Sequence, residues 1–179
     1  MWQLERLPLS DASLITLPKF DDNRGSFIKT FQASLFQQNG IDFDLKESYF
    51  SLSHKNVIRG MHFQLPPHDH SKIVFCPQGS ILDVIVDLRK ESATYGQYVA
   101  QVLSQDNHKA FFIPKGFAHG FKSLEDNTIT YYLVSSEHHG AADAGIHYDS
   151  FGMDWGKEDA ILSERDQKFV TLSNFDSPF

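Results

Sequence analysis

Two basic side chains lie three positions apart in an otherwise apolar stretch, VIRGMHFQ at residues 57–64. In a regular strand Arg59 and His62 would face opposite sides of the sheet. Gly60 between them allows a bulge or a close backbone approach, which would bring both side chains to one pocket. A lone histidine in a strand is more often a satisfied core residue, but the neutral-range pKa of imidazole also suits a general base. The stretch predicts a strand that aims a cation and a base at a ligand.

Histidine is frequent, with nine among 179 residues, and three of the nine fall in two motifs. HDH at 68–70 and PKGFAH at 114–119 resemble pieces of the two metal-binding motifs of cupins. Metal cupins add a carboxylate after the first motif, where this chain has only apolar residues. Three imidazoles can still bind a divalent ion, so a metal site remains an alternative. The second motif is the better match, a tight turn that would deliver His119 into the interior of a barrel.

Three further charged residues stand where chemistry is possible. Lys72 opens the apolar run IVFCP, so it either snorkels at a strand end or aims its ammonium at a developing oxyanion. Arg24, in the turn DDNRGSF, is a second guanidinium beside Arg59, and two converging arginines suit a diphosphate. Asp166, in LSERD, would be read as a solvated carboxylate if taken alone.

Composition narrows the class of protein. The net charge of −7 argues against nonspecific nucleic-acid binding, but it allows a local basic pocket for a small anion. The single cysteine, Cys76, lies in an apolar run, which predicts a buried structural thiol in a reducing compartment. The N-terminal stretch lacks a signal-peptide pattern, and no apolar run approaches ~18–20 residues. We expect one cytoplasmic domain over residues 1–179, with no membrane span.

The elements that must position these residues are mostly strands. Short segments rich in β-branched and aromatic residues recur between turn signals. The candidate strands are residues 13–20, 25–32, 47–54, 56–64, 72–79, 80–89, 97–104, 109–116, 118–125 and 128–136. Helical signals are confined to 33–40, which ends at a glycine, and 162–169, where Ser163 stands as an N-cap. This pattern predicts an all-β antiparallel sandwich or barrel with sixteen phenylalanines to fill it.

Residues 80–89 show the clearest alternation. Four positions on one face alternate isoleucine with aspartate, whereas the other face is wholly apolar. The segment therefore predicts a strand with one side toward the core. The mixed face carries Ile81, Asp83, Ile85 and Asp87. The apolar face carries Leu82, Val84, Val86 and Leu88.

These motifs, in this order, resemble the dTDP-4-dehydrorhamnose 3,5-epimerase family, a jelly-roll, cupin-like group. The resemblance covers about residues 13–170. It implies an epimerase of nucleotide-diphosphate-linked 4-keto-6-deoxy sugars that needs no cofactor and acts in deoxysugar and polysaccharide biosynthesis. It also implies a homodimer formed by exchanged N-terminal strands. The matching stretches are DDNRGSFIKTF, VIRGMHFQ, KIVFCPQGSILDVIVDLRKESATYG, IPKGFAHGF, GIHYD with MDW, and LSERD.

The resemblance assigns roles to individual residues. His62 looks like the general base that removes a proton beside the C4 ketone, with Asp166 fixing its tautomer and holding its charge. Lys72 looks like the group that stabilises the enolate oxygen. Arg24 and Arg59 look like a diphosphate clamp, with Arg24 reaching the site of the partner chain. The positions assigned to substrate binding are Arg24, Phe27, Lys29, Glu47, Arg59, Gln64 and His119.

One departure from the family pattern concerns the second proton transfer. The family places a tyrosine shortly before the GI segment, as the acid that returns a proton from the opposite face. This chain has SSEHHG there instead. Either His138 replaces the tyrosine, or Tyr132 or Tyr148 reaches in, or water supplies the proton. We take His138 as the candidate acid, and loss of the tyrosine would also fit epimerisation at one carbon only.

Two more departures lie at the positions expected to contact the nucleotide. Lys29 stands in place of a glutamate and Glu47 in place of a glutamine, which changes the donors and acceptors offered to a base. GDP or CDP is therefore an alternative to dTDP as the substrate's nucleotide. HDHSK also replaces the usual glutamine before the lysine and adds imidazoles at the mouth of the site.

Two functions of other classes remain open from the sequence. One is a metal-dependent cupin, a dioxygenase or isomerase, that uses His68, His70 and His119. The other is a noncatalytic sugar-nucleotide binding protein, which the missing tyrosine would suit. Metal content and solvent hydrogen exchange into a 4-keto sugar nucleotide would separate these functions from the epimerase.

Overall fold

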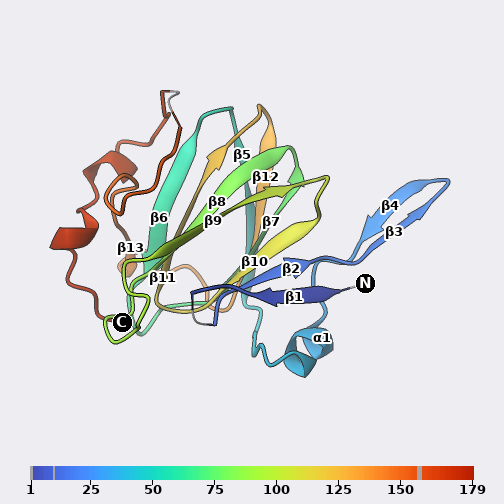
Figure 1. The fold of residues 1–179 in the computed structure, drawn as a ribbon, viewed down its shortest axis with the longest axis horizontal. Coiled ribbons are helices and arrows are strands. Elements are labelled where there is room, and N and C mark those ends of the chain that lie inside the picture. The colour runs from blue at the N-terminus through green and yellow to red at the C-terminus, as the bar shows by residue number, and fades with distance from the viewer. Residues whose placement is uncertain (1, 10, 157–158) are drawn as a thin grey trace.

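The computed structural model describes residues 2–9, 11–156 and 159–179, and its strands form two antiparallel sheets and a hairpin (Figure 1). The first sheet has the order β1 (Gln3–Arg6), β2 (Ser13–Thr16), β10 (Lys109–Ile113), β7 (Lys72–Gln78), β12 (Thr128–Val134) and β5 (Glu47–Ser53). The second has the order β13 (Asp143–Gly145), β6 (Ile58–Gln64), β11 (Phe117–Ser123), β8 (Ser80–Asp87) and β9 (Tyr98–Ser104). The hairpin joins β3 (Lys19–Asp22) to β4 (Gly25–Ile28). The predicted all-β class is confirmed.

Every predicted strand overlaps an observed one, but the strand predicted at 13–20 is divided into β2 and β3, and β1 and β13 were missed. β1 is polar and mostly exposed and β13 has three residues, so neither shows an apolar alternation. The predicted helix at 33–40 is α1 (Ala33–Gln38), which ends before Gly40. No helix among the described residues is long and apolar enough to cross a membrane.

The helix predicted at 162–169 is wrong in extent. Ser163 accepts the backbone N–H of Asp166 at 3.0 Å, as an N-cap would, but only the single 3-10 turn η1 (Asp166–Lys168) follows. A second 3-10 turn, η2 (Leu172–Asn174), lies further on. Between the two turns, Val170 pairs with Ile146 in a β-bridge, which keeps this part of the chain extended. Tertiary pairing therefore overrides a weak local helical preference.

Three apolar clusters hold the layers together. One lies between the two sheets, a second lies where α1 covers the first sheet, and a third lies where the C-terminal segment covers the second (Figure 1). β8 contributes Ile85 to the first cluster and Val84 to the third. Both faces of β8 are therefore buried, which corrects the predicted single core side. Trp155 and Phe175 belong to the C-terminal segment that covers the second sheet.

Close contact between β6 and β11 depends on two glycines. A Cβ on Gly120 would lie 2.5 Å from Sδ of Met61 and 2.9 Å from the carbonyl oxygen of Arg59, which no real Cβ tolerates. Gly60 has a φ of +152°, a conformation that L side chains rarely adopt. The pairing of the two strands shifts register here. The predicted irregularity at Gly60 is confirmed.

The β3–β4 hairpin projects away from both sheets (Figure 1). Phe20 and Phe27 on it are 58% and 63% exposed, which is unusual for large apolar side chains. Arg24 lies near its tip and pairs with Asp22 at 2.5 Å. In the single chain this hairpin therefore presents an aromatic pair and a guanidinium to solvent.

Candidate active site

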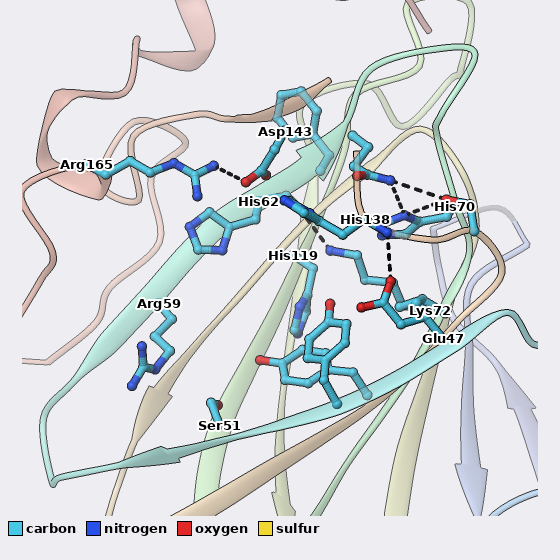
Figure 2. A pocket seen from close by; sticks show the side chains of 16 residues that line it. Glu47, Ser51, Arg59, His62, His70, Lys72, His119, His138, Asp143 and Arg165 are labelled. Carbon is cyan, nitrogen blue, oxygen red and sulfur yellow. Dashed lines mark hydrogen bonds and ion pairs between the residues drawn. The ribbon is translucent and has the colours of Figure 1, made fainter. Parts of the chain in front are cut away.

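A cavity of about 360 Å³ opens between the two sheets and receives side chains from both (Figure 2). Its size falls in the range of small-molecule sites. Arg59 and His62 of β6 both line it, as the sequence predicted. The other residues that line it are Glu47, Tyr49, Ser51, Phe63, Gln64, His70, Lys72, His119, Tyr132, Val134, Ser136, His138, Asp143 and Arg165.

His62 and Asp166 form a hydrogen-bonded pair at one wall of this cavity. Nε2 of His62 lies 2.9 Å from Oδ1 of Asp166, and the other carboxylate oxygen accepts the backbone N–H of Gly60 at 3.2 Å. Burial would raise the pKa of Asp166, but the hydrogen bonds from His62 and Gly60 outweigh burial and lower the pKa. An ionised Asp166 can only accept, so Nε2 carries the imidazole proton. The lone pair of His62 is then on Nδ1, where a base needs it.

Lys72 enters the cavity from β7 and is almost fully buried. Its ammonium donates to the carbonyl oxygen of His62 at 3.3 Å. Burial lowers the pKa of Lys72 to about 8, against the opposing effect of the carboxylates of Asp143 and Asp83. The ammonium is therefore mostly charged at neutral pH and stands ready to stabilise a developing oxyanion. The snorkelling alternative is wrong because the side chain is inside.

His119 and Asp83 form a second pair at the floor of the cavity, and both are fully buried. Nε2 of His119 lies 2.7 Å from Oδ1 of Asp83, and the ring of Tyr132 packs edge-on at 5.8 Å. Burial raises the pKa of Asp83 and lowers the pKa of His119, although each partner opposes the shift of the other. The turn before β11 brings His119 inside, as predicted.

Gln64, His70 and His138 line the same cavity. Nε2 of Gln64 donates to the carbonyl oxygen of His68 at 2.8 Å and lies 2.9 Å from Nδ1 of His70. Burial lowers the pKa of His70 to about 3, so its imidazole is neutral. The backbone N–H of His138 donates to Oε2 of Glu47 at 2.7 Å. Gln64 was predicted to bind substrate, but its amide is hydrogen-bonded within the protein itself.

Arg165 and Asp143 are among the pocket residues that were not singled out from the sequence. Arg165 pairs with Asp143 at 2.8 Å, and its guanidinium lies 5.2 Å from the centre of the Phe169 ring. Arg165 directly precedes Asp166 in LSERD, which was the available signal. Tyr49 stacks on Tyr132 at 4.7 Å. Burial, together with Glu47 and Asp143, raises the pKa of Tyr49 to about 12.

The structure leaves three predicted binding residues away from this cavity. Arg24 and Phe27 lie on the projecting hairpin, and Lys29 bonds to Gln32 beside α1. Of the two alternative tyrosines, Tyr132 lines the cavity. Tyr148 does not, and its backbone oxygen accepts the indole N–H of Trp155 instead.

The three histidines that the metal-site alternative requires each contact a different partner. The ring of His68 stacks on His139 at 3.7 Å, His70 contacts Gln64, and His119 bonds to Asp83. Within residues 2–9, 11–156 and 159–179, no three His, Cys, Asp or Glu side chains form a group that could hold a metal ion.

The fold and the cavity define a cupin-like jelly-roll protein whose site is equipped for acid–base chemistry. The family model described as dTDP-4-dehydrorhamnose 3,5-epimerase matches residues 6–174. The chain belongs to the dTDP-4-dehydrorhamnose 3,5-epimerase family, which confirms the resemblance drawn from the motifs.

Individual relatives agree with the family model. A dTDP-4-dehydrorhamnose 3,5-epimerase of Methanothermobacter thermautotrophicus is 40% identical over 168 residues, which are 90% of each chain. A dTDP-4-dehydrorhamnose 3-epimerase of Streptomyces niveus is 32% identical and covers 89% of this chain and 78% of its own. The crystal structure of a Legionella pneumophila dTDP-6-deoxy-D-glucose-3,5-epimerase in complex with dTDP-4-keto-L-rhamnose is 33% identical. It has a TM-score of 0.94 and covers 98% of this chain and 95% of its own.

Proposed function

We propose that this protein epimerises a nucleotide-diphosphate-linked 4-keto-6-deoxy sugar at C3, C5 or both. The observation that carries the proposal is the His62–Asp166 hydrogen bond at the wall of the cavity, with the ammonium of Lys72 bonded to the backbone of His62. A base beside a cation is what removal of a proton next to a ketone requires. The relatives support the substrate class, since their names specify dTDP-linked 4-keto sugars.

The residues divide the reaction into two proton transfers. Nδ1 of His62 takes the proton from the carbon beside the C4 ketone, and the C–H electrons move to the ketone oxygen as an enolate. Lys72 stabilises that oxygen, and a proton delivered to the other face of the carbon inverts it. His138 is our candidate donor because it lines the same cavity. This sequence consumes no redox equivalent, and the ammonium of Lys72 meets the charge that develops on the enolate oxygen.

Isotope exchange tests the function directly. The protein is incubated with dTDP-, GDP- and CDP-linked 4-keto-6-deoxy sugars in deuterated water, and deuterium at C3 and C5 is measured by NMR. Deuterium at either carbon of one substrate is the expected result, and its position shows whether one centre or both react. No exchange with any of the three would refute the proposal. In a thermal-shift panel of dTDP, GDP, CDP and UDP, the preferred nucleotide should raise the melting temperature most.

We also propose that the site is completed by a second copy of the chain in a homodimer. The projecting hairpin exposes Phe20, Phe27 and Arg24 to solvent in the single chain. Such an aromatic and cationic tip suits a base and a phosphate when it is placed against a neighbouring cavity. Arg59 would supply the other guanidinium of the diphosphate clamp from inside the cavity.

A complementation experiment distinguishes a site built by two chains from a site built by one chain alone. Arg24→Ala and His62→Ala variants are each expected to lose activity. If the hairpin serves the neighbouring chain, unfolding and refolding the two variants together restores activity, because one of the two sites in a mixed dimer is intact. If the mixture stays inactive, or if light scattering shows a monomer, the proposal is wrong.

A further inference from the structure

The segment that carries His138 is held by two side-chain oxygens on consecutive backbone N–H groups. The N–H of His138 donates to Oε2 of Glu47 at 2.7 Å (Figure 2). The N–H of His139 donates to Oε1 of Gln64 at 2.6 Å. Both distances are short for N–H···O bonds. The backbone on both sides of the His138 Cα is therefore fixed.

The Gln64 contact connects this segment to the strand of the proposed base. Gln64 is buried, and its Nε2 is already occupied by His68 and His70, so the amide has one orientation with its oxygen toward His139. Gln64 also lies two positions after His62 on β6, and residues two apart share one side of a strand. A displacement of β6 would therefore move His62, the proposed base, together with Gln64, which holds the His139 N–H.

The Glu47 contact connects the same segment to the other sheet. Glu47 begins β5 and pairs with Val134, the last residue of β12. The chain leaves β12 there and reaches His138 within four residues, beside the Glu47 carboxylate. Glu47 and Gln64 thus hold His138 from the two sheets that enclose the cavity.

We propose that Glu47 and Gln64 are positioning residues that fix the His138 imidazole in the cavity that His62 also lines, and that they thereby set how often reprotonation inverts the carbon. The inference rests on the proposed function. The enolate can take a proton back from His62, which restores the original configuration, or from His138, which inverts it. Both routes balance in protons: His138 delivers deuterium acquired from solvent, and His62 returns deuterium once its imidazole has exchanged with solvent. Glu47, expected from the family pattern to contact the nucleotide, would act through His138 instead.

The test is the ratio of inverted product to substrate that exchanged with retention, measured by NMR in deuterated water. Glu47→Leu removes the acceptor, and the ratio should fall about tenfold or more, because a positioned acid contributes roughly 10²–10⁴. Glu47→Gln keeps an acceptor oxygen and should stay near the wild-type ratio. Glu137→Gln, on the same segment but with its side chain outside the cavity lining, is the matched control and should change nothing.

His138→Ala gives the reference for a lost acid. Adding Glu47→Leu to His138→Ala should lower the ratio no further, since the two changes act on one group. An unchanged ratio together with a raised KM in Glu47→Leu would overturn the inference and make Glu47 a substrate contact. In that case the proposed function still stands, because exchange itself persists.

Amide hydrogen exchange tests the positioning without substrate. The His138 and His139 N–H groups should be protected in the wild-type protein and should lose protection in Glu47→Leu and Gln64→Leu, respectively. Fast exchange of both amides in the wild-type protein would overturn the inference, even if the protein proved to have no epimerase activity.

Discussion

Nε2 of His62 and Oδ1 of Asp166 lie 2.9 Å apart although 104 residues separate them in the chain. His62 belongs to a central strand, whereas Asp166 comes from a 3-10 turn of the C-terminal segment packed over that sheet. The buried apolar residues of the C-terminal segment thus bring the carboxylate to the imidazole.

The first prediction concerns this pair. His62→Ala should abolish deuterium exchange, a loss beyond the ~10²–10⁴ of a single acid–base group, because it removes the proposed base. Asp166→Asn should slow exchange by ~10² or more, since an amide can present its N–H and favour the wrong tautomer. Initial rates of exchange measure both, with the exposed Lys168→Ala as control. Exchange retained in His62→Ala would reject His62 as the base.

Much of this site was predictable because its residues lie in motifs of local sequence. Arg59, His62, Lys72 and His119 lie on strands that stand out as apolar segments between turn signals, and Gly60 marked the irregularity near Arg59 and His62. The sequence alone would have left Asp166 as a solvated residue, and only the family resemblance connected it to His62. Local sequence patterns do not show which distant segments of the chain contact each other.

The parts that were not predictable depend on long-range contacts. Asp143 lies on a three-residue strand without alternation, and its partner Arg165 comes from the C-terminal segment. Gln64 looked like a substrate contact, but its amide is hydrogen-bonded to two loop regions, residues 68–70 and 136–139. The positions of Arg24 and Phe27 relative to a site depend on a second chain, which a single chain cannot show.

The second prediction follows from the pKa of Lys72, about 8 by burial. The ammonium stabilises the enolate, so the contribution of Lys72 to activity is fully present well below this pKa and is lost as pH rises through about 8. Lys72→Arg keeps a cation that does not titrate in this range and should move the falling limb to higher pH, at a lower maximal rate. A kcat/KM profile from pH 6 to 10 measures this. A falling limb unchanged in Lys72→Arg would assign it to another group.

The third prediction concerns the acid. His138→Phe should keep deuterium exchange but lose most inversion, because His62 still removes the proton and nothing returns one from the other face. His138→Tyr places a phenol at the position where the family pattern has one and should recover inversion relative to His138→Phe. NMR of product and recovered substrate gives both quantities. Full inversion in His138→Phe would pass the role to Tyr132 or to water.

The fourth prediction concerns the buried pair beneath the site. Asp83→Leu leaves the ring nitrogen of His119 buried without its partner, which should cost about 1–3 kcal/mol of unfolding free energy. Urea titrations at one protein concentration measure it, with Asp44→Ala as an exposed ion-pair control within about 0.5 kcal/mol of wild type. Replacing both partners, Asp83→Leu with His119→Phe, removes the unsatisfied group and should recover much of the loss. A double variant as unstable as the sum of its two single variants would show that the residues contribute separately, so that their hydrogen bond does not couple them.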